Sequence, residues 1–130
     1  AAAVRYGLTV LAAEIEDDSQ NFTRFLVLAR ADTDVARPPD ALMKTSIVFA
    51  LRDNVPGALF KSLAVFALRD LDLFKIESRP RVGHPGRYLF YLDVQGRAAD
   101  EPVERALDHL GEITAELKVL GSYPMGKTVT

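Results

Sequence analysis

Apolar and polar positions follow two regular patterns from Thr45 onward. Residues 45–51 alternate between the two kinds, which predicts a half-buried strand. Residues 56–68 space their apolar positions at three and four, which predicts an amphipathic helix. A strand therefore leads directly into a helix. The apolar positions behind these predictions are Ile47, Phe49 and Leu51, and then Leu59, Phe60, Leu63, Phe66 and Ala67.

Both patterns return in the second half of the chain. Residues 71–81 and 88–94 predict two strands, joined by a turn rich in glycine and proline. Asp100 is expected to cap a second helix that has Pro102 in its first turn, and residues 118–123 supply a last strand. The apolar side of that second helix is predicted to comprise Val103, Ala106, Leu107, Leu110, Ile113 and Leu117.

The predicted order is β-α-β-β-α-β, the split arrangement of ferredoxin-like domains. Such α+β domains place two helices on one face of an antiparallel four-stranded sheet. This fold serves metal chaperones, RNA-binding modules, enzymes and small-molecule sensors, so the fold alone does not give the function. The function has to come from particular residues.

The first part of the chain has a different character. Residues 8–11 and 22–28 are short, β-prone apolar runs that predict two strands, with a polar loop at 14–21 between them. Residues 31–42 contain turn formers without periodicity, including Pro38 and Pro39, and predict a linker.

Composition narrows the function classes. The 130 residues fit one compact domain with some excess, and a net charge of -2 gives no broad attraction to nucleic acid or to an anionic membrane. The absence of cysteine excludes disulfides, zinc–thiolate sites and thiol nucleophiles. No apolar run approaches the roughly 20 residues of a membrane span. We therefore expect no metal, no cofactor, no nucleic acid and no membrane partner.

Other uses of this fold find little support in the sequence. The two histidines, His84 and His109, belong to no ligand spacing, and no serine has a neighbouring histidine and carboxylate that would indicate a hydrolase. An RNA-binding sheet would interleave basic and aromatic residues. Tyr88, Phe90 and Tyr91 have only Arg87 as a close cation, so packing explains them better.

The turn before the first predicted helix is a candidate binding site. Asn54 is expected to cap the helix, Pro56 suits its first turn, and Gly57 lets a ligand approach the backbone because it has no Cβ. Backbone N–H groups at the positive end of a helix dipole suit a small carboxylate. From the residues alone, a capped loop without a ligand is the better interpretation.

Two segments favour a ligand-binding site over a capped loop without a ligand. Residues 54–60 (Asn-Val-Pro-Gly-Ala-Leu-Phe) and 77–80 (Glu-Ser-Arg-Pro) resemble, in order, the two effector motifs of the regulatory ACT domain that ends prephenate and arogenate dehydratases, and residues 120–124 resemble its last strand. The resemblance implies that L-phenylalanine binds between two subunits. The implied effector residues are Asn54, Val55, Pro56, Gly57, Ala58 and Leu59 around the carboxylate and ammonium groups, Leu59 and Phe60 on the apolar side, and Glu77, Ser78, Arg79 and Pro80 closing the pocket.

The second motif also has a plainer interpretation. Glu77 and Arg79 alternate on a strand and would form a surface ion pair, which contributes about 0–1 kcal/mol, while Pro80 would end the strand.

Residues 21–25 (Asn-Phe-Thr-Arg-Phe) resemble the signature at the end of the dehydratase catalytic domain. The resemblance implies that Thr23 is the catalytic residue, assisting departure of hydroxide, and that Arg24 and Phe25 form the site around it. By composition alone, these would be ordinary strand residues.

The resemblance implies three parts: a β-rich remnant of the dehydratase catalytic domain at 1–30, a linker at 31–43 and an ACT domain at 44–130. The parent enzyme would be a cytoplasmic lyase, or a plastid one in a plant or alga, inhibited by L-phenylalanine. It would dimerise through ACT domains, with a tetramer as a further option, and the fragment alone would be inactive. Three alternatives stay open: arogenate as the substrate, an ACT module that only oligomerises, and an intact small enzyme.

Overall fold

The computed structural model describes residues 2–18, 23–30, 33, 40–53 and 55–126, which belong to two compact units, Ala1–Asp34 and Val35–Thr130. The first unit contains one short helix, α1 (Ala2–Tyr6), and its described residues 7–18 and 23–30 form no strand. The two strands predicted there are therefore wrong for the described residues, while Phe22 lies outside them. A β-prone run becomes a strand only when a neighbour pairs with its N–H and C=O groups, and the described side chains of these runs are exposed instead.

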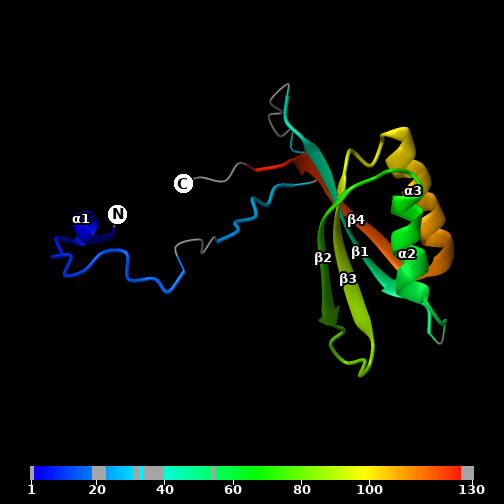
Figure 1. Ribbon diagram of the computed structural model, residues 1–130, viewed down its shortest axis with the longest axis horizontal. Coiled ribbons are helices and arrows are strands. Elements are labelled where there is room, and N and C mark those ends of the chain that lie inside the picture. Colours follow the sequence, from blue (N-terminus) through cyan, green and yellow to red (C-terminus); the bar gives the residue numbers. More distant parts are fainter. Residues whose placement is uncertain (1, 19–22, 31–32, 34–39, 54, 127–130) are drawn as a thin grey trace. The chain divides into compact units, whose positions relative to one another are not determined.

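The second unit has the predicted order of elements and is an α+β domain with a four-stranded antiparallel sheet. Its strands lie in the order β2-β3-β1-β4, with α2 and α3 together on one face (Figure 1). The elements are β1 (Met43–Leu51), α2 (Ala58–Ala67), β2 (Leu73–Pro80), β3 (Tyr88–Gln95), α3 (Glu101–Ile113) and β4 (Thr114–Pro124).

The core lies between the sheet and the two helices. Alternation along the central strands directs Ile47 and Phe49 of β1 and Leu92 of β3 to the helical side, where all three are at most 1% exposed. Phe49 stacks on Phe90 of the adjacent strand, with ring centroids 5.5 Å apart. The buried cluster is completed by Val65, Phe66, Val94, Val103, Ala106, Leu107 and Leu110.

Both helices begin close to the predicted positions. α2 begins at Ala58 with Gly57 as its N-cap, so Pro56 precedes the helix instead of lying in its first turn, and Asn54 is outside the described residues. Asp100 is the N-cap of α3 and Pro102 follows in its first turn, as predicted. The Asp100 carboxylate, however, accepts a hydrogen bond from the Arg97 backbone N–H at 2.7 Å and none from the helix.

The second helix ends earlier than its apolar spacing predicts. α3 stops at Ile113, and Leu117, predicted on the helix, lies in β4. Thr114 adopts an extended backbone and its hydroxyl donates to the Leu110 carbonyl at 2.7 Å, which occupies an acceptor at the helix end. Leu117 still packs against the core, so its apolar character is explained by the strand as well as by a helix.

A buried ion pair joins the two central strands on the face away from the helices. Lys44 and Asp93 are 8% and 7% exposed, and their charged groups are 2.8 Å apart. Ser46 donates to the second Asp93 oxygen at 2.5 Å, so the Tyr123 hydroxyl, also 2.5 Å from Ser46 Oγ, is the donor in that contact. Burial alone raises the pKa of Asp93, but hydrogen bonds from Lys44 and Ser46 outweigh it and hold that pKa below its ordinary value.

Truncating a side chain of the core should cost far more than truncating an exposed side chain of the same domain. Leu110→Ala removes a fully buried side chain, so we expect the free energy of unfolding to fall by about 2–5 kcal/mol. Leu120→Ala, at a position 52% exposed, is the matched control and should cost less than half as much. Urea denaturation measures both; equal losses would contradict this assignment of the core.

Removing the charge of Asp93 should also be costly. Asp93→Asn keeps the shape but leaves the Lys44 ammonium buried without its counter-charge, so we expect a loss of about 3–5 kcal/mol at neutral pH. Because the folded pKa of Asp93 is lowered, its stabilisation is complete above the unfolded value of about 3.9 and disappears as pH falls through the folded value. The free energy of unfolding of the unmodified chain should thus fall more between pH 5 and pH 2 than that of Asp93→Asn. Urea titrations at intervals of about one pH unit measure both. Asp108→Asn, at an exposed position on α3, is the control; a loss as large as that of Asp93→Asn would contradict this account.

Candidate functional site

The turn between β1 and α2 presents backbone groups at a helix N-terminus. Gly57 has a φ of 68°, in the left-handed region that favours glycine, and an added Cβ would meet no atom within 4 Å. The turn is closed by a bond from the Ala58 N–H to the Val55 carbonyl at 3.2 Å. The first N–H groups of any α-helix lack intrahelical acceptors. Both conformation and open space therefore suit a close approach of an anionic group here.

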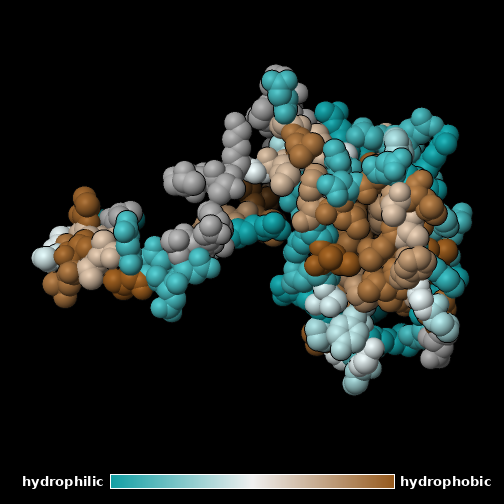
Figure 2. All heavy atoms as spheres, in the orientation of Figure 1, coloured by the Kyte–Doolittle hydropathy of each residue, from teal (hydrophilic) through white to brown (hydrophobic). Residues whose placement is uncertain are grey.

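Exposed apolar side chains lie in this turn and at both ends of α2. Phe60 and Leu68, at the two ends of α2, are 77% and 79% exposed, and Val55 is 39% exposed. Figure 2 shows brown, apolar surface gathered over α2. We call Val55, Phe60 and Leu68 the outer face of α2. Large side chains exposed together often mark a binding surface.

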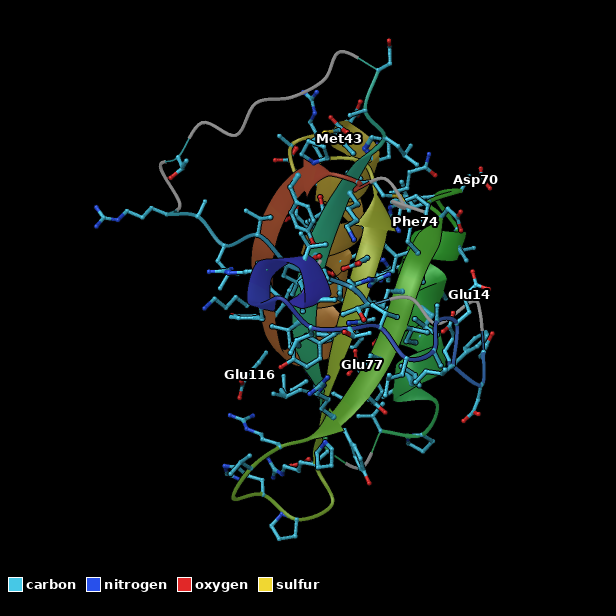
Figure 3. The ribbon with its side chains drawn as sticks, turned by 90° about the vertical axis from the view of Figure 1, so that its left-hand side faces the viewer. Glu14, Met43, Asp70, Phe74, Glu77 and Glu116 are labelled. Atoms are coloured by element: carbon cyan, nitrogen blue, oxygen red, sulfur yellow. The ribbon has the colours of Figure 1, made fainter. Side chains whose placement is uncertain are left out.

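The second predicted motif ends β2, at the edge of the sheet. Lys75, Glu77 and Arg79 pair across the ladder with Asp93, Tyr91 and Leu89. Asp93 points away from the helices, because its neighbours Leu92 and Val94 are in the core. Lys75, Glu77 and Arg79 therefore lie on the helix-free face of the sheet, which Figure 3 views directly and where it labels Glu77. By the same alternation, Ser78 and Pro80 point to the helical side.

Glu77 holds two cations at once. Its Oε2 lies 2.6 Å from Lys75 Nζ, and its Oε1 lies 2.5 Å from Arg79 Nε. The hydrogen bond from Lys75, followed by that from Arg79, lowers the pKa of Glu77, so this carboxylate is charged at neutral pH. The predicted ion pair between Glu77 and Arg79 is thus confirmed, and Arg79 remains largely exposed.

The sheet separates the charged pair of the second motif from the turn. β1 and β2 both run antiparallel to β3, so their C-terminal ends lie at the same end of the sheet. An ion pair between Asp53 and Arg87 joins the start of β3 to the β1–α2 turn. The turn and the side chains of Ser78 and Pro80 belong to the helical side, whereas Glu77 and Arg79 lie on the opposite face. The described residues of one chain therefore do not bring Glu77 and Arg79 into one pocket with the turn.

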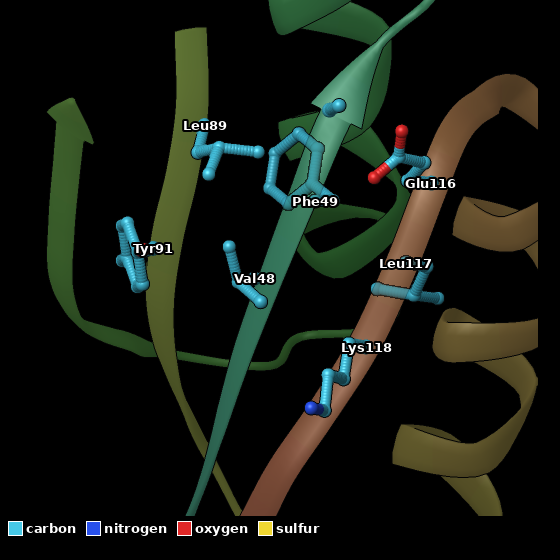
Figure 4. A pocket seen from close by; sticks show the side chains of 8 residues that line it. Val48, Phe49, Leu89, Tyr91, Glu116, Leu117 and Lys118 are labelled. Carbon is cyan, nitrogen blue, oxygen red and sulfur yellow. The ribbon is translucent and has the colours of Figure 1, made fainter. Parts of the chain in front are cut away.

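A shallow depression of about 430 Å³ lies elsewhere, on the helix-free face. Figure 4 shows Val48, Leu89 and Tyr91 beside the charged side chains of Glu116 and Lys118. Glu116 is also paired with Arg81 at 2.6 Å. Sequence reasoning missed this depression, although the alternation that places Ile47 and Phe49 inside also places Val48 on this face.

The predicted catalytic residues belong to the first unit. Thr23, Arg24 and Phe25 have neither helical nor strand conformation and are exposed, Phe25 by 84%. Among the described residues no three histidine, cysteine or acidic side chains are grouped to hold a metal ion. No described helix combines the length and apolarity that crossing a membrane requires.

Comparisons with known proteins agree with the motifs. A family model described as prephenate dehydratase matches residues 1–33. Arogenate dehydratase/prephenate dehydratase 2 of Arabidopsis thaliana is 50% identical over 98% of this chain and 35% of its own length. The bifunctional chorismate mutase/prephenate dehydratase of Aquifex aeolicus is 48% identical over 95% of this chain and 33% of its own length. The chain thus spans about a third of these relatives.

A solved structure gives the same result. The crystal structure of prephenate dehydratase from Arthrobacter aurescens in complex with L-Phe superposes with a TM-score of 0.61 at 36% identity, covering 72% of this chain and 30% of that one. Sequence relatives, the order of the motifs and the fold of the second unit therefore agree. Over nearly its whole length the chain is homologous to prephenate and arogenate dehydratases, and its α+β unit has the fold found in a prephenate dehydratase solved with L-Phe.

Proposed function

We propose that this chain is the regulatory C-terminal region of a prephenate dehydratase and binds L-phenylalanine for feedback control, at a site completed by two copies of the chain. The observation that carries the proposal is the separation of the turn from Glu77 and Arg79. Both motifs lie at the same end of one sheet, yet the turn is on the helical side and these two charged side chains are on the opposite face. A second copy that contributes the other motif would close the pocket. The L-Phe complex of the Arthrobacter aurescens relative supports the choice of ligand.

Different residues would contact different groups of the bound amino acid. The turn at Val55, Pro56 and Gly57 and the start of α2 at Ala58 and Leu59 would surround the carboxylate, with Gly57 and Leu59 as backbone N–H donors, because Pro56 has no N–H and Ala58 donates its own to the Val55 carbonyl. Asn54, predicted to assist there, lies outside the described residues. Leu59 and Phe60 would contact the phenyl ring, and Phe60 is exposed enough to do so. Glu77, Ser78, Arg79 and Pro80 of the other copy would close the pocket.

L-phenylalanine can regulate the enzyme only if it binds two arrangements of the paired domains with different affinities. L-phenylalanine stabilises whichever arrangement of paired domains encloses it better, and it shifts the equilibrium by that difference alone. Burying the outer face of α2 between two copies would supply the apolar part of the interface. We expect the parent enzyme to be a homodimer or a tetramer of paired domains, located in the cytoplasm, or in a plastid if the source is a plant or alga.

The parent enzyme would convert prephenate to phenylpyruvate, with Thr23, Arg24 and Phe25 in its catalytic site. Arogenate is the alternative substrate, because the relatives include enzymes named for each. In either case the ring carboxylate leaves as CO2, the electron pair of the broken C–C bond expels the hydroxide as the ring becomes aromatic, and a threonine hydroxyl can donate a proton to that hydroxide so that it leaves as water.

A second candidate function is assembly without a ligand. The exposed apolar residues on the outer face of α2 would favour pairing of domains whether or not an amino acid binds. Titration with amino acids separates the two candidates.

Changing Gly57 should weaken effector binding selectively. Gly57→Asp places a carboxylate beside that of the ligand, so we expect L-phenylalanine affinity to fall by about tenfold or more, as measured by isothermal titration calorimetry. Gly83→Asp is the matched control, because Gly83 also has a positive φ, 78°, and open space around its Cβ. Both variants should lose similar stability from backbone strain. Equal affinities in the two variants would contradict this placement of the carboxylate.

The chain by itself should not dehydrate prephenate. Thr23, Arg24 and Phe25 are exposed, and the chain spans about a third of its relatives, so these residues lack the surroundings that an active site requires. Phenylpyruvate formation, followed by its absorbance in alkali, should equal the uncatalysed rate. Turnover above that rate which Thr23→Val abolishes would instead establish an intact small enzyme.

A further inference from the structure

A row of polar side chains crosses all four strands on the helix-free face of the sheet. It begins at Tyr123 on β4, passes Ser46 on β1 and Asp93 on β3, and reaches Lys75 on β2. Ser46 and Asp93 are ladder partners, and so are Asp93 and Lys75. Directly opposed side chains on one face lie close enough to interact. We call these four residues the polar row.

The polar row ends at Lys75, which pairs with the first residue of the second effector motif, Glu77. Lys75 lies between two carboxylates, with Asp93 opposite it in the ladder and Glu77 at 2.6 Å. Glu77 in turn lies between two cations and uses a separate oxygen for each, Oε2 for Lys75 and Oε1 for Arg79. From Lys44 to Arg79 the charges therefore alternate in sign through Asp93, Lys75 and Glu77.

This alternation fixes the geometry of Arg79. The series of charges begins at Lys44 and Asp93, which are less than a tenth exposed, and ends at Arg79, whose side chain is 69% exposed. Arg79 uses its Nε for Glu77, so the planar guanidinium is held at one edge while the group itself faces outward. Without Lys75, Glu77 would keep a single cationic partner and a wider choice of rotamers. An exposed arginine held in this way has less side-chain freedom to lose when it meets a carboxylate.

We propose that Lys75 is a positioning residue of the effector site: it holds Glu77, and through Glu77 the guanidinium of Arg79, in the orientation that closes on the bound amino acid. This inference rests on the proposed function. It adds that effector affinity depends on a residue outside both effector motifs. It also explains why a lysine precedes the Glu-Ser-Arg-Pro segment on the same face of the strand.

The test uses three variants of the 130-residue chain and L-phenylalanine as the probe. Lys75→Gln should weaken L-phenylalanine binding about fivefold or more in calorimetry, with a small change in thermal midpoint, because Glu77 keeps its pair with Arg79 and Asp93 keeps its pair with Lys44. Lys75→Arg keeps the charge and should restore the affinity. Lys118→Gln is the matched control, since it removes one exposed lysine from the same face, on β4, and should bind like the unmodified chain.

A second measurement needs no ligand. In the proton spectrum of the free chain, the Arg79 Nε–H signal should shift toward its solvent-exposed position in Lys75→Gln and stay in place in Lys118→Gln.

The outcomes separate the inference from the proposed function. If the unmodified chain binds L-phenylalanine and Lys75→Gln binds it as tightly, or Lys118→Gln is weakened equally, the inference is overturned and the proposed function stays intact. If Lys75→Gln unfolds, Lys75→Arg decides the question: affinity and the Arg79 signal both retained, or both changed, support the inference, and a change in one without the other overturns it. Failure of the unmodified chain to bind would overturn both.

Discussion

The ion pair between Lys44 and Asp93 is the constraint on which the helix-free face of the sheet depends. It joins β1 to β3, the two central strands, at a place where neither charge reaches much water. Such a pair is tolerated only when further hydrogen bonds complete it, and Ser46 supplies one, itself bonded to Tyr123. A shift of register by one residue would turn Asp93 into the apolar core, so the pair also helps to specify the pairing of the strands.

The two faces of the sheet carry different roles. The helical face holds the packed core, and the last strand extends it with Leu117. The opposite face carries an ordered series of charges that ends at Glu77 and Arg79 on the edge strand. An edge strand with charged side chains resists indiscriminate pairing with other chains. Phe60 and Leu68, by contrast, are exposed apolar side chains at the two ends of α2, where a second copy is proposed to bind.

Much of the fold could be predicted, because apolar periodicity reports burial and burial decides these elements. The order of strands and helices, and Asp100 at a helix start, were readable from local pattern alone. Leu117 was misassigned because a spacing of four from Ile113 suits a helix, while the Thr114 hydroxyl bond that ends it has no signal in hydrophobicity. The runs at 8–11 and 22–28 failed for another reason, since strand formation depends on a pairing partner, which local sequence does not encode.

The site was predictable as motifs but not as geometry. Nothing in the spacing of residues 54–60 and 77–80 reveals that Glu77 faces away from the helical layer, because that orientation follows from the pairing of Lys75 with Asp93. The central claim, a site shared by two copies, is tested most directly by sedimentation equilibrium with and without saturating L-phenylalanine. The account predicts that the dimer dissociation constant falls in L-phenylalanine and not in D-phenylalanine, since a ligand enclosed by two chains must favour their association. Saturable binding of L-phenylalanine that leaves this constant unchanged would contradict it.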